Sequence, residues 1–262
     1  MISIPDAEPG YVYLVGAGPG DPALLTLRAA HLIKTADVIL PDDLVSDEVL
    51  GIASPTAIVI PVGKRCGQPR ITQAGIHDLM LEHASAGNSV IRLKSGDPLV
   101  FGRAAEEISF LREHSLPFEI VPGITAAFAV AATLQTPLTD RTRASKLILA
   151  TAHHAAGKLS LTPRWSGAFP DEATLVIYMP GRDFEALARD LIASGIAPTT
   201  SCVAVSRAST PEEHIHITTL AELSSTNVGP APVILLIGPS TQRPDHSGIA
   251  PRVPEPQQHR SS

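Results

Sequence analysis

Between residues 10 and 136, short apolar runs alternate with amphipathic stretches. Five apolar runs have the length of buried strands, at 11–16, 38–40, 57–62, 89–93 and 118–123. Four stretches between or after them show the apolar spacing of helices, at 23–36, 72–86, 104–115 and 125–135. Strands that alternate with helices are typical of a parallel sheet covered on both faces. This half therefore predicts an α/β domain with a mainly parallel sheet.

The second half of the chain has a different pattern, in which predicted strands outnumber predicted helices. Five further runs are typical of strands, at 146–152, 174–180, 201–208, 214–220 and 232–238, but only 183–195 predicts a clear helix. Since strands outnumber helices here, some strand pairs should be antiparallel and the sheet mixed. The composition changes near residues 135–139, so we expect two α/β domains, at 10–136 and 137–242.

The two ends of the chain predict disorder. Residues 1–9 are short and polar, and the segment 243–262 contains four prolines and few aliphatic side chains. The first ten residues do not have the pattern of a signal peptide, and the longest apolar run falls far short of the ~18 residues that span a bilayer. With two cysteines in 262 residues, no disulfide framework is expected. These features favour a cytoplasmic protein without a membrane partner.

Charge and ligand-forming residues exclude two further classes of function. The net charge of −6 and pI of about 5.9 disfavour a nucleic-acid partner. Neither the pair His153–His154 nor the pair His214–His216 has a third ligand at metal spacing, so no metal is expected.

A glycine-rich turn, VGAGPGDP, follows the first strand at 15–22. It resembles the start of a dinucleotide-binding fingerprint, but the third glycine of that pattern is replaced by Asp21. This substitution argues against a nicotinamide-dependent oxidoreductase. Gly16, Gly18 and Gly20 still allow a ligand to approach the carboxyl end of the strand, where ligands bind in open α/β sheets. A plain tight turn is the alternative interpretation.

Four more loops should open on the same edge of the sheet, because each follows a predicted strand. They are PDDLVS at 41–46, VGKR at 62–65, KSGDPLVFGRAAEE at 94–107 and PGIT at 122–125. Arg103 and Glu106 lie three residues apart at the start of a predicted helix, so they share one helix face. Taken singly, each loop is also compatible with solvated charges and ordinary helix starts.

Together and in this order, these loops resemble the tetrapyrrole methylase family over roughly residues 10–240. The resemblance is closest to the members that methylate uroporphyrinogen III. It implies two α/β domains with the active site and S-adenosylmethionine in the cleft between them, and no metal. It also implies a homodimer that methylates carbons 2 and 7 of uroporphyrinogen III to give precorrin-2, a precursor of siroheme, cobalamin or heme d1.

The resemblance also implies roles for individual residues. Positions that match cofactor contacts are Pro19, Ser95, Gly96, Asp97, Val100, Thr125, Ala126, Met179 and Ala208. Positions that match catalytic residues are Asp42 as base, Lys64 as acid, and Arg103 and Glu106 in substrate and proton handling. The sequence alone leaves open whether Asp42, Asp43 or Glu106 is the base.

The chain departs from the family pattern at Pro41, where tyrosine is usual, and at Ser95 and Ala208, where glycine is usual. Pro41 has a fixed φ and so can change which aspartate faces the cleft. Residues 60–146 carry ten basic and eight acidic side chains, although the whole chain is acidic. A local positive charge suits a substrate with several carboxylates.

Three related interpretations compete with this one. A sister methylase acting on a later corrin precursor would share fold and cofactor, although VGKR and FGR-x-x-EE favour uroporphyrinogen III. A ribosomal RNA methylase is opposed by the acidic charge and the aromatic content of 4%. A module that binds S-adenosylmethionine without catalysis is supported only by Pro41.

Overall fold

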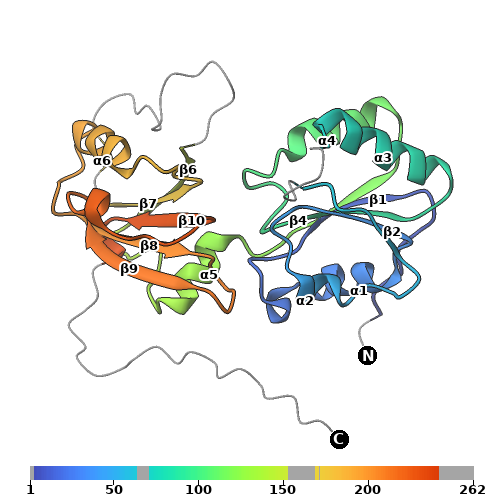
Figure 1. Cartoon of the computed structure of the whole chain (residues 1–262), viewed down its shortest axis with the longest axis horizontal. Helices are drawn as coiled ribbons and strands as arrows, with labels where there is room; N and C mark the ends of the chain where they lie inside the picture. Colours follow the sequence, from blue (N-terminus) through green and yellow to red (C-terminus); the bar gives the residue numbers. More distant parts are fainter. Residues whose placement is uncertain (1–2, 64–70, 153–168, 171, 242–262) are drawn as a thin grey trace, which may run out of the picture. The chain divides into compact units, whose positions relative to one another are not determined.

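The computed structural model describes residues 3–63, 71–152, 169–170 and 172–241. The chain folds into two compact units (Figure 1). The first unit comprises the ranges 1–129, 205–215 and 227–234, and the second comprises 130–204, 216–226 and 235–262. The sequence-predicted boundary at residue 136 differs from the start of the second unit at Val130, and the division into domains at 136 stays a prediction.

The first sheet is parallel, as the sequence predicts. Its five described strands are β1 (Val12–Gly16), β2 (Val38–Pro41), β3 (Ile58–Val59), β4 (Val90–Lys94) and β5 (Phe118–Val121). Their order is β3-β2-β4-β1-β5, and each neighbouring pair is parallel. All carboxyl ends therefore lie at one edge of the sheet, with the central strands β4 and β1 side by side.

Helices cover both faces of this sheet (Figure 1). α1 (Leu27–Thr35) and α2 (Asp47–Leu50) share one apolar cluster with the sheet, and α3 (Gln73–Ser85) and α4 (Ala104–Glu113) share the other. α1, α2 and α3 begin at a capping side chain: the hydroxyls of Thr26, Ser46 and Thr72 each accept a backbone N–H. The cap at Thr26 explains why α1 begins later than the helix predicted from residue 23. The four-residue α2 was not predicted.

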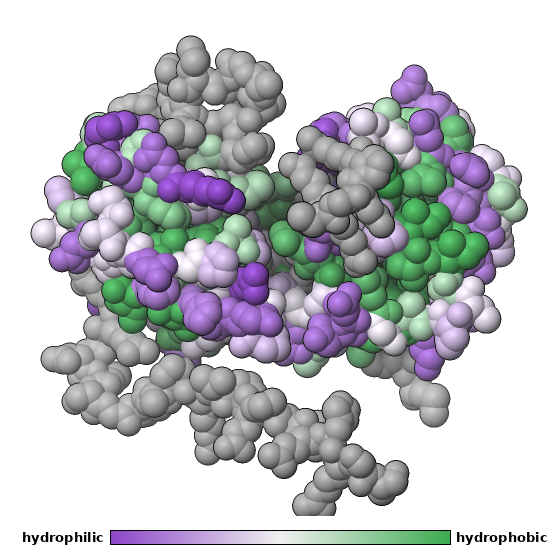
Figure 2. Space-filling model, viewed as in Figure 1, coloured by the Kyte–Doolittle hydropathy of each residue, from purple (hydrophilic) through white to green (hydrophobic). Residues whose placement is uncertain are grey.

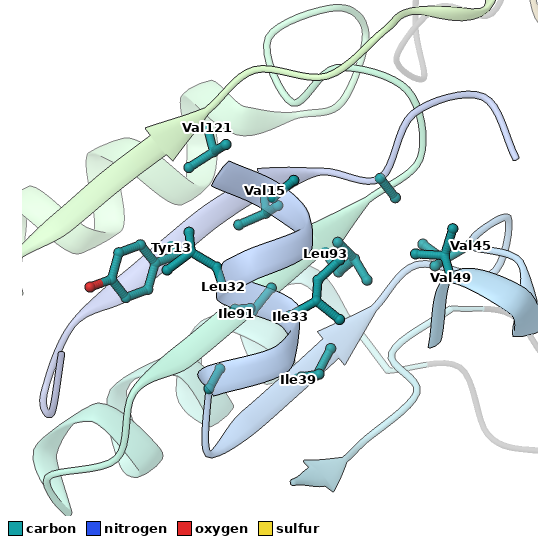
Figure 3. Close-up of a cluster of buried hydrophobic side chains, with 13 residues drawn as sticks. Tyr13, Val15, Leu32, Ile33, Ile39, Val45, Val49, Ile91, Leu93 and Val121 are labelled. Atoms are coloured by element: carbon teal, nitrogen blue, oxygen red, sulfur yellow. The ribbon is translucent and has the colours of Figure 1, made fainter. Parts of the chain in front are cut away.

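The core follows from the two-residue period of the strands. Tyr13 and Val15 of β1 point to the α1 side (Figure 3), whereas Val12 and Leu14 contribute to the α3–α4 side. All four are buried. Because helices cover both faces of the sheet, β1 is apolar on both faces, and apolar and polar residues do not alternate along it.

The second sheet is mixed. Its described strands are β6 (Lys146–Thr151), β7 (Ala173–Tyr178), β8 (Ser201–Ser206), β9 (His214–Thr219) and β10 (Val233–Ile237), in the order β6-β7-β10-β8-β9. β6 and β7 are parallel. β8 and β10 are antiparallel, because the Gly238 N–H donates to Ser201 O while the Arg207 N–H donates to Pro232 O. The helices α5 (Ala126–Thr133) and α6 (Phe184–Ala193) match the predicted ones.

The amino-terminal segment makes contacts that its polar composition did not predict. The Ala7 N–H donates to Thr35 Oγ1 at 3.1 Å, and the Glu8 N–H donates to the Tyr13 hydroxyl at 2.9 Å. Arg28 Nη1 donates to the Pro5 carbonyl. Residues 5–8 thus lie along α1 and β1, although the sequence predicts disorder for 1–9. The predicted disordered tail, 243–262, lies outside the described residues.

The surface mixes polar and apolar residues in the view of Figure 2. Ile58 and Val59 of the short edge strand β3 are exposed, as are Leu27 and Phe128. In the described parts of the chain, none of the helices is both long enough and apolar enough to cross a membrane.

Candidate active site

Three turns meet at the carboxyl edge of the first sheet. Gly18 and Gly96 form an isolated β-bridge between the turns after β1 and β4. A Cβ added at Gly16 would lie 2.6 Å from Gly123 in the turn after β5, closer than real side chains approach. Gly16 and Gly123 are therefore required by the close approach of these two chain segments.

Gly96 is required for a different reason. Its φ of +69° lies in the left-handed region. The nearest atom to an added Cβ, Thr125 Cα, would be 3.8 Å away. An added Cβ would thus make ordinary van der Waals contact with Thr125, so the positive φ, and not lack of space, favours glycine at this position.

Asp97 ties two of these turns together. Its Oδ1 accepts the Leu99 N–H at 2.8 Å, and its Oδ2 accepts the Gly123 N–H at 2.9 Å. Both carboxylate oxygens thus hold backbone of the loops that carry Ser95, Gly96 and Thr125. A structural role for Asp97 is shown by this geometry, and its predicted contact with the cofactor stays a prediction.

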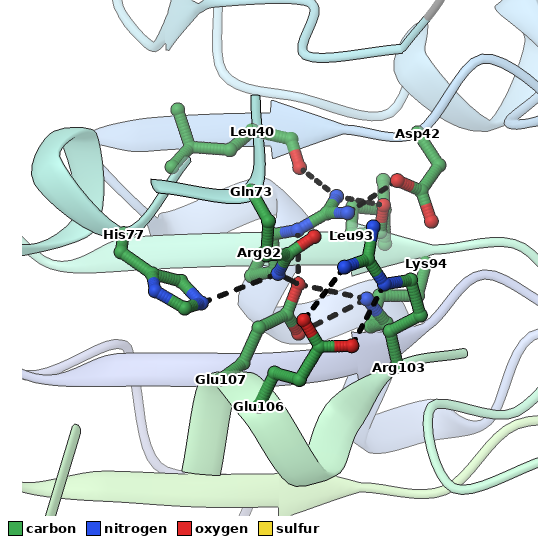
Figure 4. A network of polar contacts seen from close by, with 10 residues as sticks. All are labelled: Leu40, Asp42, Gln73, His77, Arg92, Leu93, Lys94, Arg103, Glu106 and Glu107. Carbon is green, nitrogen blue, oxygen red and sulfur yellow. Dashed lines mark hydrogen bonds and ion pairs between the residues drawn. The ribbon is translucent and has the colours of Figure 1, made fainter. Parts of the chain in front are cut away.

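A buried network of charges lies beneath the same edge (Figure 4). Arg92 and Lys94 occupy alternate positions of β4 and point to the α3–α4 face, where they meet Glu107 of α4. The Lys94 Nζ lies 2.9 and 3.0 Å from the two Glu107 oxygens, and Arg92 Nε lies 3.0 Å from Oε1. The three side chains are 0–3% exposed.

Burial and the neighbouring Arg92 guanidinium lower the pKa of the Lys94 ammonium, while the Glu107 carboxylate opposes this effect. The network extends to the surface through Gln73, whose Nε2 lies 3.2 Å from Glu107 Oε1 and 3.2 Å from His77 Nε2. Burial lowers the pKa of His77, which favours its neutral form.

Asp42 joins the network from the loop after β2. Its Oδ1 accepts a hydrogen bond from Arg92 Nη2, and its backbone N–H donates to Leu93 O at 2.9 Å. Its side chain is 33% exposed and lines a cavity. Asp43, the next residue, is exposed and is not part of the cavity wall. Pro41 is the last residue of β2, and Asp42 rather than Asp43 lines the cavity.

The cavity holds about 220 Å³. Its polar walls come from Asp42, Gln73, Arg92, Lys94 and Arg103, and its apolar walls from Val62, Ile71, Ile76 and Phe101. Three cationic side chains and one carboxylate thus line it among the described residues. This volume is below the ~300–1,000 Å³ of typical small-molecule sites, so the cavity suits one acidic substituent of a larger ligand.

Arg103 and Glu106 form an exposed ion pair at the start of α4. Arg103 Nε and Nη2 donate to the two Glu106 oxygens at 2.9 and 2.6 Å, and both side chains are about half exposed. The hydrogen bond from Arg103 lowers the pKa of Glu106, which makes this carboxylate a weaker base. Arg103 thus engages both oxygens of Glu106, whereas among the described residues Arg92 engages only Oδ1 of Asp42, and this geometry favours Asp42 as the proton acceptor.

Replacing Arg103 by alanine is expected to separate two interpretations of this pair. If the guanidinium grips a substrate carboxylate, turnover falls strongly while cofactor affinity stays near wild type. If the pair only stabilises the helix start, Arg103→Ala costs about 0–1 kcal/mol of stability and leaves turnover normal. We expect the first result, measured as rate and melting temperature in the same variant.

The other residues predicted from the sequence lie as follows. Pro19 lies in the turn after β1, Val100 in the loop after β4, and Thr125 and Ala126 at the start of α5. Ala208 lies in the 205–215 segment of the first unit. The next residue, Ser209, lies near the turn after β1, because its carbonyl oxygen would be 3.0 Å from a Cβ added at Gly20. Met179 follows β7 in the second unit and is half exposed. Lys64 lies outside the described residues.

Two further chemistries find little support in the described parts of the chain. No group of three or more His, Cys, Asp and Glu side chains there is placed to hold a metal ion. Burial raises the pKa of the Cys202 thiol to about 12, so this cysteine is not a thiolate nucleophile near neutral pH.

Comparison with known proteins identifies the family. The sequence profile of the Tetrapyrrole (Corrin/Porphyrin) Methylases matches residues 11–224. The chain belongs to the tetrapyrrole methylases. The resemblance of its loops to this family is thereby confirmed.

Two relatives of this tetrapyrrole methylase have informative names. The chloroplastic S-adenosyl-L-methionine-dependent uroporphyrinogen III methyltransferase of Arabidopsis thaliana is 43% identical over 89% of the chain. The uroporphyrinogen-III C-methyltransferase of a Sinorhizobium species is 41% identical over 90% of the chain and 85% of its own length. The chain spans 64% of the length of the plant relative.

A solved structure agrees with the fold of this tetrapyrrole methylase. The uroporphyrin-III C-methyltransferase of Thermus thermophilus, complexed with S-adenyl homocysteine, superimposes with a TM-score of 0.72. It is 38% identical, and the match covers 87% of this chain and 92% of that one. The predicted α/β fold, with a parallel and a mixed sheet, is confirmed.

Proposed function

We propose that this tetrapyrrole methylase transfers methyl groups from S-adenosylmethionine to carbons 2 and 7 of uroporphyrinogen III, giving precorrin-2. The observation that carries the proposal is the 41% identity to the Sinorhizobium enzyme over 90% of the chain. The cavity supports it, because the half-exposed Arg103 guanidinium in its wall can bind an acidic side chain of the substrate.

The turns at the carboxyl edge are suited to hold the methyl donor. Gly96 adopts a left-handed turn, and Thr125 and Ala126 lie at the adjoining start of α5. We assign cofactor contacts to Pro19, Ser95, Gly96, Asp97, Val100, Thr125, Ala126, Met179 and Ala208. The bound donor would supply a methyl group already activated by its sulfonium charge.

The chain's own residues then have two tasks, orientation and proton removal. When the ring carbon takes the methyl group, the carbon–sulfur bond breaks and the positive charge passes to the macrocycle. A proton must leave the macrocycle to restore its neutral charge. We assign Asp42 to accept this proton, Lys64 to act as the acid, and Arg103 with Glu106 to orient the substrate.

A sister methylase acting on a later corrin precursor would share the fold and the methyl donor, so substrate identity must be tested directly. The decisive assay adds uroporphyrinogen III or a later methylated precursor to the protein with S-adenosylmethionine. We expect S-adenosylhomocysteine to form with uroporphyrinogen III. Release only with the later precursor would assign the chain to the sister activity, and binding without release would assign it to a non-catalytic module.

The oligomeric state and the location of the protein are also proposals. We propose a homodimer, which the family resemblance implies. We also propose a cytoplasmic location, as the sequence predicts. No membrane or nucleic-acid partner is expected.

A further inference from the structure

Arg92 is held from several directions at once. Its Nε donates to Glu107 Oε1 at 3.0 Å, and its Nη1 donates to the carbonyl oxygens of Leu40 at 3.0 Å and Leu93 at 3.3 Å. Its Nη2 donates to Asp42 Oδ1. The guanidinium thus uses most of its five N–H donors, and it is buried.

These anchors come from different parts of the first unit. Leu40 belongs to β2, Leu93 to β4 and Glu107 to α4 (Figure 4). A planar guanidinium fixed to two strands and one helix cannot rotate without breaking several buried hydrogen bonds. Arg92 is therefore a rigid point at the carboxyl edge of the sheet.

Asp42, in contrast, lies in a loop and is partly exposed. Its Oδ1 accepts a hydrogen bond from Arg92, whereas its Oδ2 accepts none from the described residues. The bond to Arg92 therefore sets the orientation of the carboxylate at the cavity wall.

We propose that Arg92, anchored by Glu107, is a positioning residue that orients the Asp42 carboxylate for proton removal. This inference rests on the proposed function. It gives Arg92 and Glu107, whose side chains are 3% and 0% exposed, a role through their hydrogen bonds rather than through a grip on the substrate. Arg92 acts through Asp42 and is not itself a catalytic residue.

The first variant is Arg92→Lys, which keeps the positive charge but loses the planar guanidinium group and its fixed set of N–H donors. We expect kcat to fall roughly tenfold or more, because misorientation of a catalytic group is costly. The KM values for uroporphyrinogen III and S-adenosylmethionine should change little. An unchanged kcat in a folded Arg92→Lys protein would overturn the proposal.

The decisive readout is the double variant Arg92→Lys with Asp42→Asn. If Arg92 acts through Asp42, the double variant is no slower than Asp42→Asn alone. Losses that multiply would show that Arg92 acts independently, and would overturn the proposal. Absence of turnover by the wild-type protein would instead reject the proposed function.

Two further variants guard against a simple loss of folding. Glu107→Asp keeps the charge balance but shortens the anchor of Arg92, so kcat should fall here too, with no further loss in the Asp42→Asn background. Wild-type kcat in Glu107→Asp would contradict the anchoring. Arg28→Lys is the control for loss of an Arg–carboxylate pair away from the cavity, because Arg28 binds Glu119 at 3.1 and 2.7 Å on the opposite face of the sheet, where the two side chains are 25% and 39% exposed. Its kcat should remain at the wild-type value.

Discussion

Asp42→Asn should slow methyl transfer by about 10²–10⁴-fold, the usual cost of losing a general base. Asparagine has nearly the same shape and keeps an oxygen that can accept the hydrogen bond from Arg92 Nη2. The substitution therefore removes the basic group while preserving its surroundings. The dissociation constant for S-adenosylmethionine, measured by calorimetry, should stay near the wild-type value.

Asp43→Asn is the matched control for this prediction. Asp43 is exposed and is not part of the cavity wall, so its substitution should leave the rate nearly unchanged. A large loss in Asp43→Asn alone would move the base by one residue. If neither variant nor the double variant slowed turnover tenfold, Glu106 would become the candidate despite its lowered pKa.

Glu107→Gln should destabilise the protein by about 3–5 kcal/mol, measured by denaturant unfolding. Glu107 is fully buried and is the shared partner of Arg92 and Lys94. Glutamine has nearly the same volume, but its amide N–H₂ would face the Lys94 ammonium, a donor against a donor. The neighbouring substitution Glu106→Gln breaks only an exposed pair and should cost about 0–1 kcal/mol.

The double variant Glu107→Gln with Lys94→Met tests the cause of this loss. It removes one buried charge of each sign, so much of the stability should return. If the double variant is less stable than Glu107→Gln alone, the loss does not come from the unpaired Lys94 charge. Packing at position 107 would then be the cause.

The Lys94 pKa also predicts how stability changes with pH. Burial lowers this pKa below its ordinary value of 10.5, so the folded protein binds this proton less tightly than the unfolded chain. Stability linked to Lys94 therefore rises with pH between the lowered pKa and 10.5. Without the Glu107 carboxylate the Lys94 pKa should fall further, so the deficit of Glu107→Gln should shrink as pH rises from the variant's pKa to the wild-type pKa.

Most of the fold was predictable because the strands of the first sheet are buried on both faces. Runs such as 11–16 and 89–93 are apolar almost throughout, and such runs have the length of strands rather than helices. The short helix α2 was missed, because four residues contain too few apolar positions to show a period. The contacts of residues 5–8 were missed because they use backbone groups and carry no side-chain pattern.

The site was predictable only where polar residues follow strands. Asp42 and Arg103 were found in this way, and the structure places both in the wall of one cavity. Arg92, Lys94 and Glu107 were not assigned a role, because Arg92 and Lys94 were counted only as part of the local charge and Glu107 adjoins the exposed Glu106. The signal was nevertheless present: two cations at alternate positions of an apolar strand point to one face and require a buried partner.

The central claim is that this chain methylates uroporphyrinogen III twice. The most direct test incubates the purified protein anaerobically with uroporphyrinogen III and S-adenosylmethionine, and follows the macrocycle by mass and absorbance. We predict a singly methylated intermediate, then a product with the mass of two added methyl groups and the absorbance of precorrin-2. An unmethylated macrocycle, recovered while the protein still binds S-adenosylmethionine, would contradict the claim.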